Sequence, residues 1–204
     1  MEKTIIRNKI VDAQKDYLLR NDLGFEGDFI LKETIEKIVK DNDVEAIIET
    51  GTYRGSTTLQ FSKMVKIVHT IEASSDYFNE SKKKLQFVQN VVQYLGKSED
   101  IFEDVVSLCK RRNLLLFLDA HWFNSCPLID ELKAVARLKL KPIILIHDFK
   151  VPGTDFGFDS YNGQDFTIEW LRPHLEAIYG QDFKYFYNTK AEGARRGVLF
   201  VNCG

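Results

Sequence analysis

The sequence has few cysteines, and those it has form no pattern that would hold a metal or a disulfide framework. The three cysteines, Cys109, Cys126 and Cys203, are odd in number and far apart. Disulfide-rich folds and zinc knuckles need closely spaced pairs, so neither is expected. This cysteine usage indicates a reducing compartment, and we expect a cytoplasmic protein.

A surplus of one charge and a long apolar run are also missing. Lys and Arg together number 28 and Asp and Glu 30, which leaves a net charge of -2. This balance provides no general field for attracting nucleic acid or an anionic membrane. The charged N-terminus lacks the apolar core of a signal peptide, and no window approaches the roughly 18 apolar residues of a membrane span. We therefore expect neither nucleic acid nor a membrane as a partner.

What the sequence does contain is a regular alternation of short β-branched runs and longer amphipathic ones, typical of βαβ units. Its 204 residues, 44% of them apolar, suffice for one sizeable core. The sequence predicts an α/β fold with a doubly wound, seven-stranded, mostly parallel sheet and an antiparallel C-terminal hairpin. The expected strands are 44–49, 66–72, 91–95, 114–119, 141–148, 183–188 and 197–202. The expected helices are 56–65, 76–87, 98–110, 127–140 and 164–179.

The first 43 residues differ from this pattern and read as two helices around "NDLGFEGDF". We expect an N-terminal helical cap over 1–43 and a main domain over 44–204. By analogy, such a cap can support a homodimer. Within the main domain, Ser56 and Ser98 are expected to cap their helices by accepting bonds from free helical N–H groups.

The stretch "IIETGTYRGSTTLQF", residues 47–61, contains more than a turn requires. It follows the first strand, where ligands bind in open parallel sheets. Gly51 and Gly55 permit positive φ and close backbone approach, and Thr52 and Ser56 add hydroxyls. The helix beginning near Ser56 presents free N–H groups. A plain strand-to-helix turn is the alternative interpretation of the same residues.

Glu72 ends the second expected strand, roughly 20 residues after the glycine loop, where an acid can accept hydrogen bonds from both ribose hydroxyls. A solvated carboxylate at a strand end is the alternative. Together, the loop and the acid favour an adenosine-type cofactor. The dinucleotide fingerprint GxGxxG is absent, and the loop reads "ETGTYRG" instead.

This stretch, Glu49 to Gly55, resembles the first motif of the class I S-adenosylmethionine-dependent methyltransferases, an acid-x-G-x-x-x-G arrangement. The resemblance covers about residues 44–202 and includes Glu72, "GKSEDIF" after the third strand and "FLDAHW" after the fourth. It implies S-adenosylmethionine as the cofactor. The implied contacts are Glu49 near the methionine amino group, Gly51, Thr52, Gly55, Ser56 and Asp119 along the cofactor, Glu72 on the ribose, and Ser98 with Glu99 or Asp100 near the adenine.

Within that superfamily, "ETGTYRGSTT", "LDAHW" and "IHDF" are most similar to small-molecule and sugar O-methyltransferases related to macrocin O-methyltransferase and to cephalosporin-hydroxylase-like proteins. The implied reaction is O-methylation of a small polar acceptor such as a sugar or glycoside. A nucleotide-binding or structural protein that keeps the fold without turnover is the alternative.

Candidate catalytic residues follow the fourth and fifth strands: Asp119, His121, His147 and Asp148. In one interpretation His147 or His121 is a general base, since an ordinary imidazole titrates near neutral pH. In the other, Asp119 and Asp148 hold a divalent ion such as Mg²⁺ that activates the acceptor hydroxyl. Relatives of the macrocin type carry acidic residues for a metal here, but "HD" replaces their "DD".

Two further segments are expected near the acceptor. The loop 149–163 is longer than a bare connection needs and predicts a lid, with Tyr161 and Trp170 among its candidate apolar walls. Arg195 and Arg196 lie in the hairpin connection. They could contact an anionic acceptor, but a solvated turn is the favoured interpretation.

Overall fold

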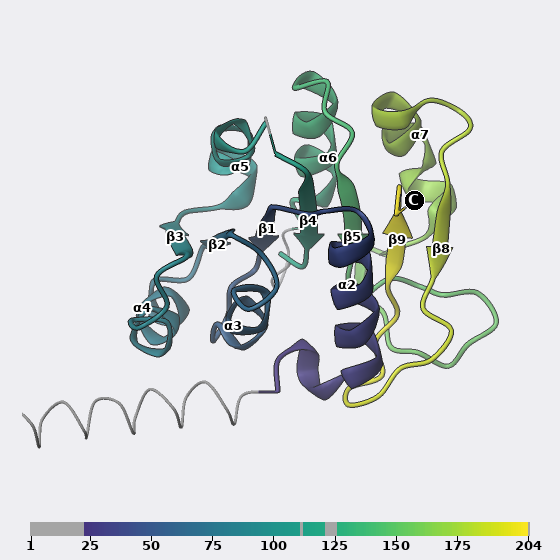
Figure 1. The fold of residues 1–204 in the computed structure, drawn as a ribbon. Coiled ribbons are helices and arrows are strands. Elements are labelled where there is room, and N and C mark those ends of the chain that lie inside the picture. Colours follow the sequence, from purple (N-terminus) through teal and green to yellow (C-terminus); the bar gives the residue numbers. More distant parts are fainter. Residues whose placement is uncertain (1–22, 111, 121–125, 204) are drawn as a thin grey trace, which may run out of the picture.

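The computed structural model describes residues 23–110, 112–120 and 126–203. Seven strands form one sheet in the order β3-β2-β1-β4-β5-β9-β8 (Figure 1). The strands β1 to β5 pair in parallel, whereas β9 is antiparallel to both β5 and β8, which confirms the predicted fold. The bounds are β1 Ala46–Thr50, β2 Ile67–Glu72, β3 Val91–Leu95, β4 Leu114–Leu118, β5 Ile143–Ile146, β8 Tyr185–Tyr187 and β9 Leu199–Val201.

Helices cover both faces of this sheet because successive strand residues point to opposite sides. Ile48 of β1 packs with α5, α6 and α7, whereas its neighbour Ile47 packs with α2 and the end of α3. None of the described helices is long and apolar enough to cross a membrane. The bounds are α2 Phe29–Asp41, α3 Ser56–Phe61, α4 Ser75–Lys84, α5 Ser98–Leu108, α6 Leu128–Arg137 and α7 Ile168–Tyr179.

Three helix starts differ from the sequence predictions. Gly55, in the left-handed conformation, stands at the N-cap of α3, and Ser56 instead accepts a bond from Lys84 Nζ at 2.7 Å. Lys97 precedes α5, so Ser98 is not its cap. The helix α7 begins later than predicted because Gln164–Asp165 forms strand β7 of a small hairpin with β6, Ser160–Tyr161.

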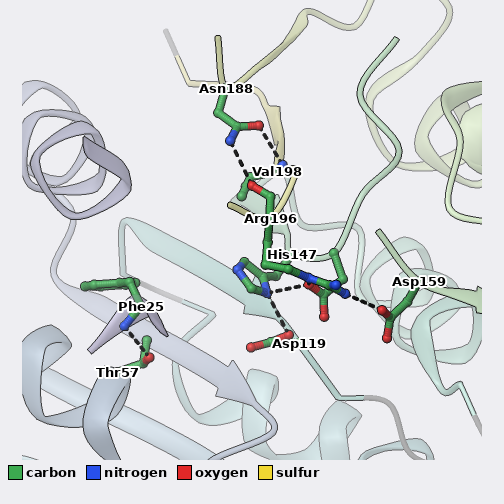
Figure 2. A network of polar contacts seen from close by, with 9 residues as sticks. Phe25, Thr57, Asp119, His147, Asp159, Asn188, Arg196 and Val198 are labelled. Carbon is green, nitrogen blue, oxygen red and sulfur yellow. Dashed lines mark hydrogen bonds and ion pairs between the residues drawn. The ribbon is translucent and has the colours of Figure 1, made fainter. Parts of the chain in front are cut away.

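The described part of the predicted cap is a layer of the main fold. A short 3-10 helix, η1 Phe25–Gly27, leads into α2, and Phe25 contacts Phe61 and Phe117 at ring-centroid distances of 5.2 and 6.3 Å. The Phe25 N–H also donates to Thr57 Oγ1 at 3.0 Å (Figure 2). These contacts bring the N-terminal segment to the carboxyl ends of the strands. The remainder of the predicted cap lies outside the described residues, and the division at residue 43 stays a prediction.

Candidate active site

A cavity of about 460 Å³ lies at the carboxyl ends of β1, β2 and β4. The strand order reverses between β1 and β4, which is where open α/β sheets bind ligands. The fold therefore places the cavity where the sequence predicted a site. Its lining residues are Glu26, Gly51, Tyr53, Ile71, Glu72, Ala73, Ser74, Tyr77, Gly96, Ser98, Asp119, Ala120 and Asp148.

The lining is acidic. Glu26, Glu72, Asp119 and Asp148 contribute carboxyl groups, and no Lys, Arg or His is found among the described lining residues. Burial raises the pKa of Glu26, and the nearby Asp148 and Asp119 raise it further, although His147 opposes them. Closely spaced carboxylates in a partly dry site favour a cationic or hydroxyl-rich ligand and disfavour phosphate groups.

Gly51 is required by the close approach of two strand ends. Its φ is +85°, and a Cβ added there would lie 2.5 Å from the Asp119 carbonyl oxygen. The neighbouring Thr50 carbonyl accepts the Asp119 N–H at 3.2 Å, which fixes that approach. The glycine thus lets the loop after β1 lie against the end of β4 and leaves the backbone open to the cavity.

Glu72 is held by backbone amides at the cavity wall. It is 8% exposed, and its carboxylate accepts the N–H groups of Tyr53 at 2.7 Å and Ser74 at 2.8 Å. Burial raises its pKa, and these amide contacts partly offset the effect. Each carboxylate oxygen has two acceptor positions, so Glu72 can still accept ligand hydroxyls. The rings of Tyr53 and Tyr77, 4.4 Å apart, stand beside it in the lining.

Glu49 lies beneath the cavity rather than in its lining. Its carboxyl accepts the hydroxyls of Thr58 at 2.5 Å and Thr70 at 2.7 Å, and Thr70 also contacts Thr52 at 2.5 Å. Burial raises the pKa of Glu49 to about 8. Glu49 points to the same sheet face as Ile47, toward α3, because side chains alternate along β1. In this position Glu49 supports the loop, and the direct cofactor contact expected for it stays a prediction.

The other predicted cofactor residues divide into two groups. Ser98 and Asp119 line the cavity, and the buried Ser98 Oγ has no hydrogen-bond partner among the described residues. The residues outside the described lining are Thr52, Gly55, Ser56 and Glu99.

Gly55 in particular serves packing between helices. A Cβ added there would lie 3.1 Å from both Ser81 Cβ and Leu85 Cδ1, at the C-terminal end of α4. Its φ of +75° also suits the turn into α3. The second glycine of the motif thus shapes the loop, whereas the first one faces the cavity.

Asp119, His147 and Asp148 form a second polar cluster, next to the cavity. His147 Nδ1 lies 3.1 Å from Asp119 Oδ1 and 3.2 Å from Asp148 Oδ1. Burial lowers the pKa of His147, but the two aspartates outweigh it and raise the pKa well above its ordinary value. His147 is 5% exposed and absent from the described lining, whereas both aspartates line the cavity. His121 lies outside the described residues.

This geometry argues against His147 as the group that contacts an acceptor. A buried imidazolium whose Nδ1–H faces two carboxylates holds a proton and orients those carboxylates. The sequence supplied the residue types but not their exposure, because Asp119 lies 28 residues away at the end of a different strand. The role of His147 as a base stays a prediction, and its contacts in this arrangement are those of a residue that positions Asp119 and Asp148.

Arg196 joins the cluster from the hairpin connection, against the solvated-turn interpretation. Its Nε donates to Asp148 Oδ1 and its Nη2 to Asp159 Oδ1 (Figure 2). Its backbone is fixed by Asn188, whose Nδ2 donates to the Arg196 carbonyl at 3.0 Å. Asn188 Oδ1 also accepts the Val198 N–H at 2.8 Å. The exposed Arg195 pairs with Asp155 at 2.7 Å, so only one of the two arginines was correctly expected at the surface.

The predicted metal pair meets only part of what a divalent ion needs. One ligand atom each from Asp119, His147 and Asp148 lies within 4.8 Å of the others. However, His147 Nδ1 faces the carboxylates as a donor, and Arg196 donates to Asp148. Two unit charges about 4 Å apart interact by about 4 kcal/mol at the effective dielectric near a protein surface, and a divalent ion would be repelled more strongly. As arranged, the donor set does not fit an ion.

Two of the expected acceptor walls, Tyr161 and Trp170, pack inward, whereas Phe158 of the same loop is exposed. Tyr161 stacks on Phe166 at 5.8 Å, and Phe166 stacks on Trp170 at 5.6 Å. Tyr161 and Trp170 pack against the core formed by α5, α6 and α7, and neither belongs to the described cavity lining. These rings stabilise the loop after β5, and their expected role as acceptor walls stays a prediction.

Comparisons with known proteins bear on the fold. No protein-family model and no curated protein matches the chain. An O-methyltransferase from Bacillus cereus in complex with SAH is 13% identical, with a TM-score of 0.58 over 95% of this chain and 89% of the other. The O-methyltransferase TomG from Streptomyces achromogenes, in complex with SAM, is 15% identical, with a TM-score of 0.57 over 84% and 78%. A precorrin 8W decarboxylase from Methanobacterium thermoautotrophicum is 13% identical, with a TM-score of 0.53 over 85% and 89%.

The chain therefore has the fold of the S-adenosylmethionine-dependent methyltransferases. This confirms the resemblance read from "ETGTYRG" at the level of the fold, while the closer similarity to macrocin O-methyltransferase stays a prediction. The decarboxylase shows that proteins of this fold are named for other reactions. The chemistry must therefore be argued from the site.

Proposed function

We propose that the protein is an S-adenosylmethionine-dependent methyltransferase that O-methylates a small polar molecule. The observation that carries this proposal is the acidic cavity at the switch point between β1 and β4. S-Adenosylmethionine carries a sulfonium cation, which the carboxyl groups of Glu26, Glu72 and Asp119 in the lining would attract. A phosphate-bearing dinucleotide would be repelled by the same groups.

The chain's residues fit such a ligand. Gly51 presents open backbone, Glu72 retains acceptor positions for ribose hydroxyls, and Ser98 belongs to the same lining. The Tyr53 and Tyr77 rings beside Glu72 provide apolar surface for an aromatic base. The acid for the ribose, the open backbone at Gly51 and the two tyrosine rings therefore all lie around one cavity.

Methyl transfer to a hydroxyl requires that the acceptor lose its proton. When bound, the cofactor supplies an electrophilic methyl group on sulfur. Asp119 lines the cavity with its side chain 27% exposed, so its carboxylate can accept the proton from the acceptor oxygen. His147 holds the other side of Asp119 and fixes its orientation. Placement of the two reactants supplies much of the rate.

For the acceptor we propose a neutral, hydroxyl-rich molecule such as a sugar or glycoside. The sequence resemblance supports this acceptor. The carboxyl groups of Glu26, Asp119 and Asp148 also support it, because they accept hydrogen bonds from hydroxyl groups and repel anions. The cytoplasmic location and the homodimer expected from the sequence stay predictions.

Calorimetry with S-adenosylmethionine and S-adenosylhomocysteine tests the cofactor. We expect both to bind, and Glu72→Gln to weaken binding about 10- to 100-fold, because a hydrogen bond to a charged group contributes about 1.5–3 kcal/mol. Glu103→Gln is the matched control, since Glu103 is exposed and pairs with Arg137 away from the cavity. Thermal melting of both variants separates lost binding from lost folding, because Glu72 also holds two backbone amides.

Absence of binding by the wild-type chain would contradict the proposal. Binding without a gain of one methylene in any member of a broad sugar panel would favour the alternative, a nucleotide-binding protein that keeps the fold without turnover. Product mass spectrometry makes that distinction.

A further inference from the structure

We propose that Arg196 takes the place of a divalent cation at the cluster of Asp119, His147 and Asp148, so that this site works without a bound metal. This inference rests on the proposed function only in its statement about methyl transfer. Its structural statement is that Arg196, and not a metal ion, neutralises Asp148. Metal binding by the chain alone can test that statement.

The first argument is the geometry of the guanidinium. Arg196 donates from Nε to Asp148 and from Nη2 to Asp159, so two different nitrogens bracket two carboxylates (Figure 2). Asp148 has a side chain only 7% exposed, and that of Arg196 is 25% exposed. Arginine stays charged at every relevant pH, and a partly buried pair of this kind is screened little by salt. Asp148 therefore has a permanent cation where a metal ion would otherwise be needed.

The second argument is that the surrounding backbone is shaped to hold this side chain. A Cβ added to Gly157 would lie 2.8 Å from an Arg196 guanidinium nitrogen, so a larger residue there would press on the arginine. The Gly157 N–H donates to the Arg195 carbonyl at 2.8 Å, and the Gly197 N–H donates to the Gly157 carbonyl at 2.9 Å. Asn188 fixes the other side of the same segment. The loop after β5 and the β8–β9 connection thus close around Arg196.

The third argument concerns Asp148 itself. It is a non-glycine residue with φ of +57°, an uncommon conformation that costs energy unless surrounding contacts hold it. Arg196 and His147 provide such contacts from two directions. With both in place, Asp148 presents its carboxylate to the cavity beside Asp119 while its charge is balanced. Arg196 is in this sense a positioning residue.

A titration with Mn²⁺ tests the proposal. The full chain is first freed of metals with EDTA, and binding is then followed by electron paramagnetic resonance. We expect the wild type to bind Mn²⁺ no more tightly than about 1 mM. Arg196→Gln removes the fixed charge, and we expect it to bind Mn²⁺ at least about tenfold more tightly, since Asp148 and Asp159 then lose the positive charge of the guanidinium. Arg196→Lys keeps the charge and should behave like the wild type.

Arg195→Gln is the matched control, because Arg195 is the adjacent residue and pairs with an exposed aspartate. It should leave Mn²⁺ binding unchanged. The proposal is overturned if the wild type binds one Mn²⁺ per chain in the micromolar range, or if folded Arg196→Gln binds no better than the wild type. Should Arg196→Gln not fold, the wild-type titration decides alone.

These measurements need neither cofactor nor acceptor, so they are independent of the calorimetry with S-adenosylmethionine. Tight Mn²⁺ binding by a wild type that also binds the cofactor would overturn the metal-free arrangement and leave the proposed function standing. Where methyl transfer is found, EDTA should change the rate by less than about twofold.

Discussion

Two cavities of similar size lie at opposite edges of the sheet, and their charges are opposite. The one at the carboxyl edge measures about 460 Å³ and is lined by Glu26, Glu72, Asp119 and Asp148. The one at the amino edge measures about 440 Å³, and its described lining contains cations but no acid. Those cations are Lys110, Arg112 and Lys141.

The difference teaches that size does not identify the site in this protein. Acids follow β2, β4 and β5, whereas bases precede β4 and β5, and parallel strands gather each kind at one edge. Within the described residues, the carboxyl edge adds a glycine that faces the cavity and a cluster of paired charges behind it. A basic hollow without such features needs no function, because exposed lysines are ordinary at a surface.

The largest expected effect comes from Gly51→Ala, which tests whether the carboxyl-edge cavity depends on the backbone. The added Cβ would lie 2.5 Å from the Asp119 carbonyl oxygen, at a φ of +85°. We expect a loss of about 3 kcal/mol or more in the free energy of unfolding, together with loss of cofactor binding. Urea denaturation and calorimetry measure the two effects.

Gly153→Ala is the control for this change. Gly153 has φ of +75°, and a Cβ there meets nothing within 4 Å, so it carries the conformational strain without the clash. We expect the free energy of unfolding to fall by about 1–2 kcal/mol and cofactor binding to stay unchanged. If Gly51→Ala and Gly153→Ala lowered the free energy of unfolding equally, the clash with Asp119 would make no contribution to the effect at Gly51.

A smaller effect is expected from Glu49→Gln, which tests the support beneath the carboxyl-edge cavity. The folded-state pKa of Glu49, about 8, lies above its ordinary value of 4.5, so the folded chain holds the extra proton between these values. The free energy of unfolding must then fall as pH rises through this window, by about 1.4 kcal/mol per pH unit at most. Glu49→Gln should remove that part of the slope in urea denaturation between about pH 5 and 8.

Burial also raises the pKa of Glu131, to about 7. The free energy of unfolding of Glu49→Gln should therefore still fall somewhat as the pH rises. Replacement of the exposed Glu33 by Gln should leave the wild-type slope unchanged. Parallel curves for the wild type and Glu49→Gln would mean that Glu49 is ionised in the folded chain, and its neutral hydroxyl-bound state would be refuted.

The smallest effect is expected at the amino edge. Replacing Lys110 and Lys141 together by Gln removes two positive charges from the second cavity. This cavity lies at the ends of the strands opposite the carboxyl edge. We therefore expect a cofactor affinity within about twofold of the wild type and a free energy of unfolding within about 0.5 kcal/mol of it. A larger fall in affinity would remove the contrast between the two edges.

Much of the fold followed from local patterns. Nearly continuous apolar runs predicted the strands, and all seven occur in the sheet with ends shifted by a few residues. The start of α7 was placed too early, because Gln164 and Asp165 pair with Ser160 and Tyr161 across a turn. That pairing depends on contacts between residues that helical periodicity cannot reveal.

The candidate site was only partly predictable. Strand ends carry their acids into one cavity because all parallel strands end at the same edge, so Glu72 and Asp119 could be placed from the sequence. The burial of Glu49 could not, since it depends on Thr58 and Thr70 arriving from α3 and β2. Glu26 was missed as well, although "GFEGD" with its two glycines signalled a tight turn.

The sequence alone thus determined the α/β order, the glycine loop and the acids at the strand ends, because these depend on neighbours within a few residues. Only the tertiary structure decided which of these groups face the cavity and which are covered. It also decided that Arg196 leaves the surface to bind Asp148 and Asp159. The physical reason is that charge pairing and burial depend on residues about 40 positions apart in the chain, which only the folded sheet and its loops bring together.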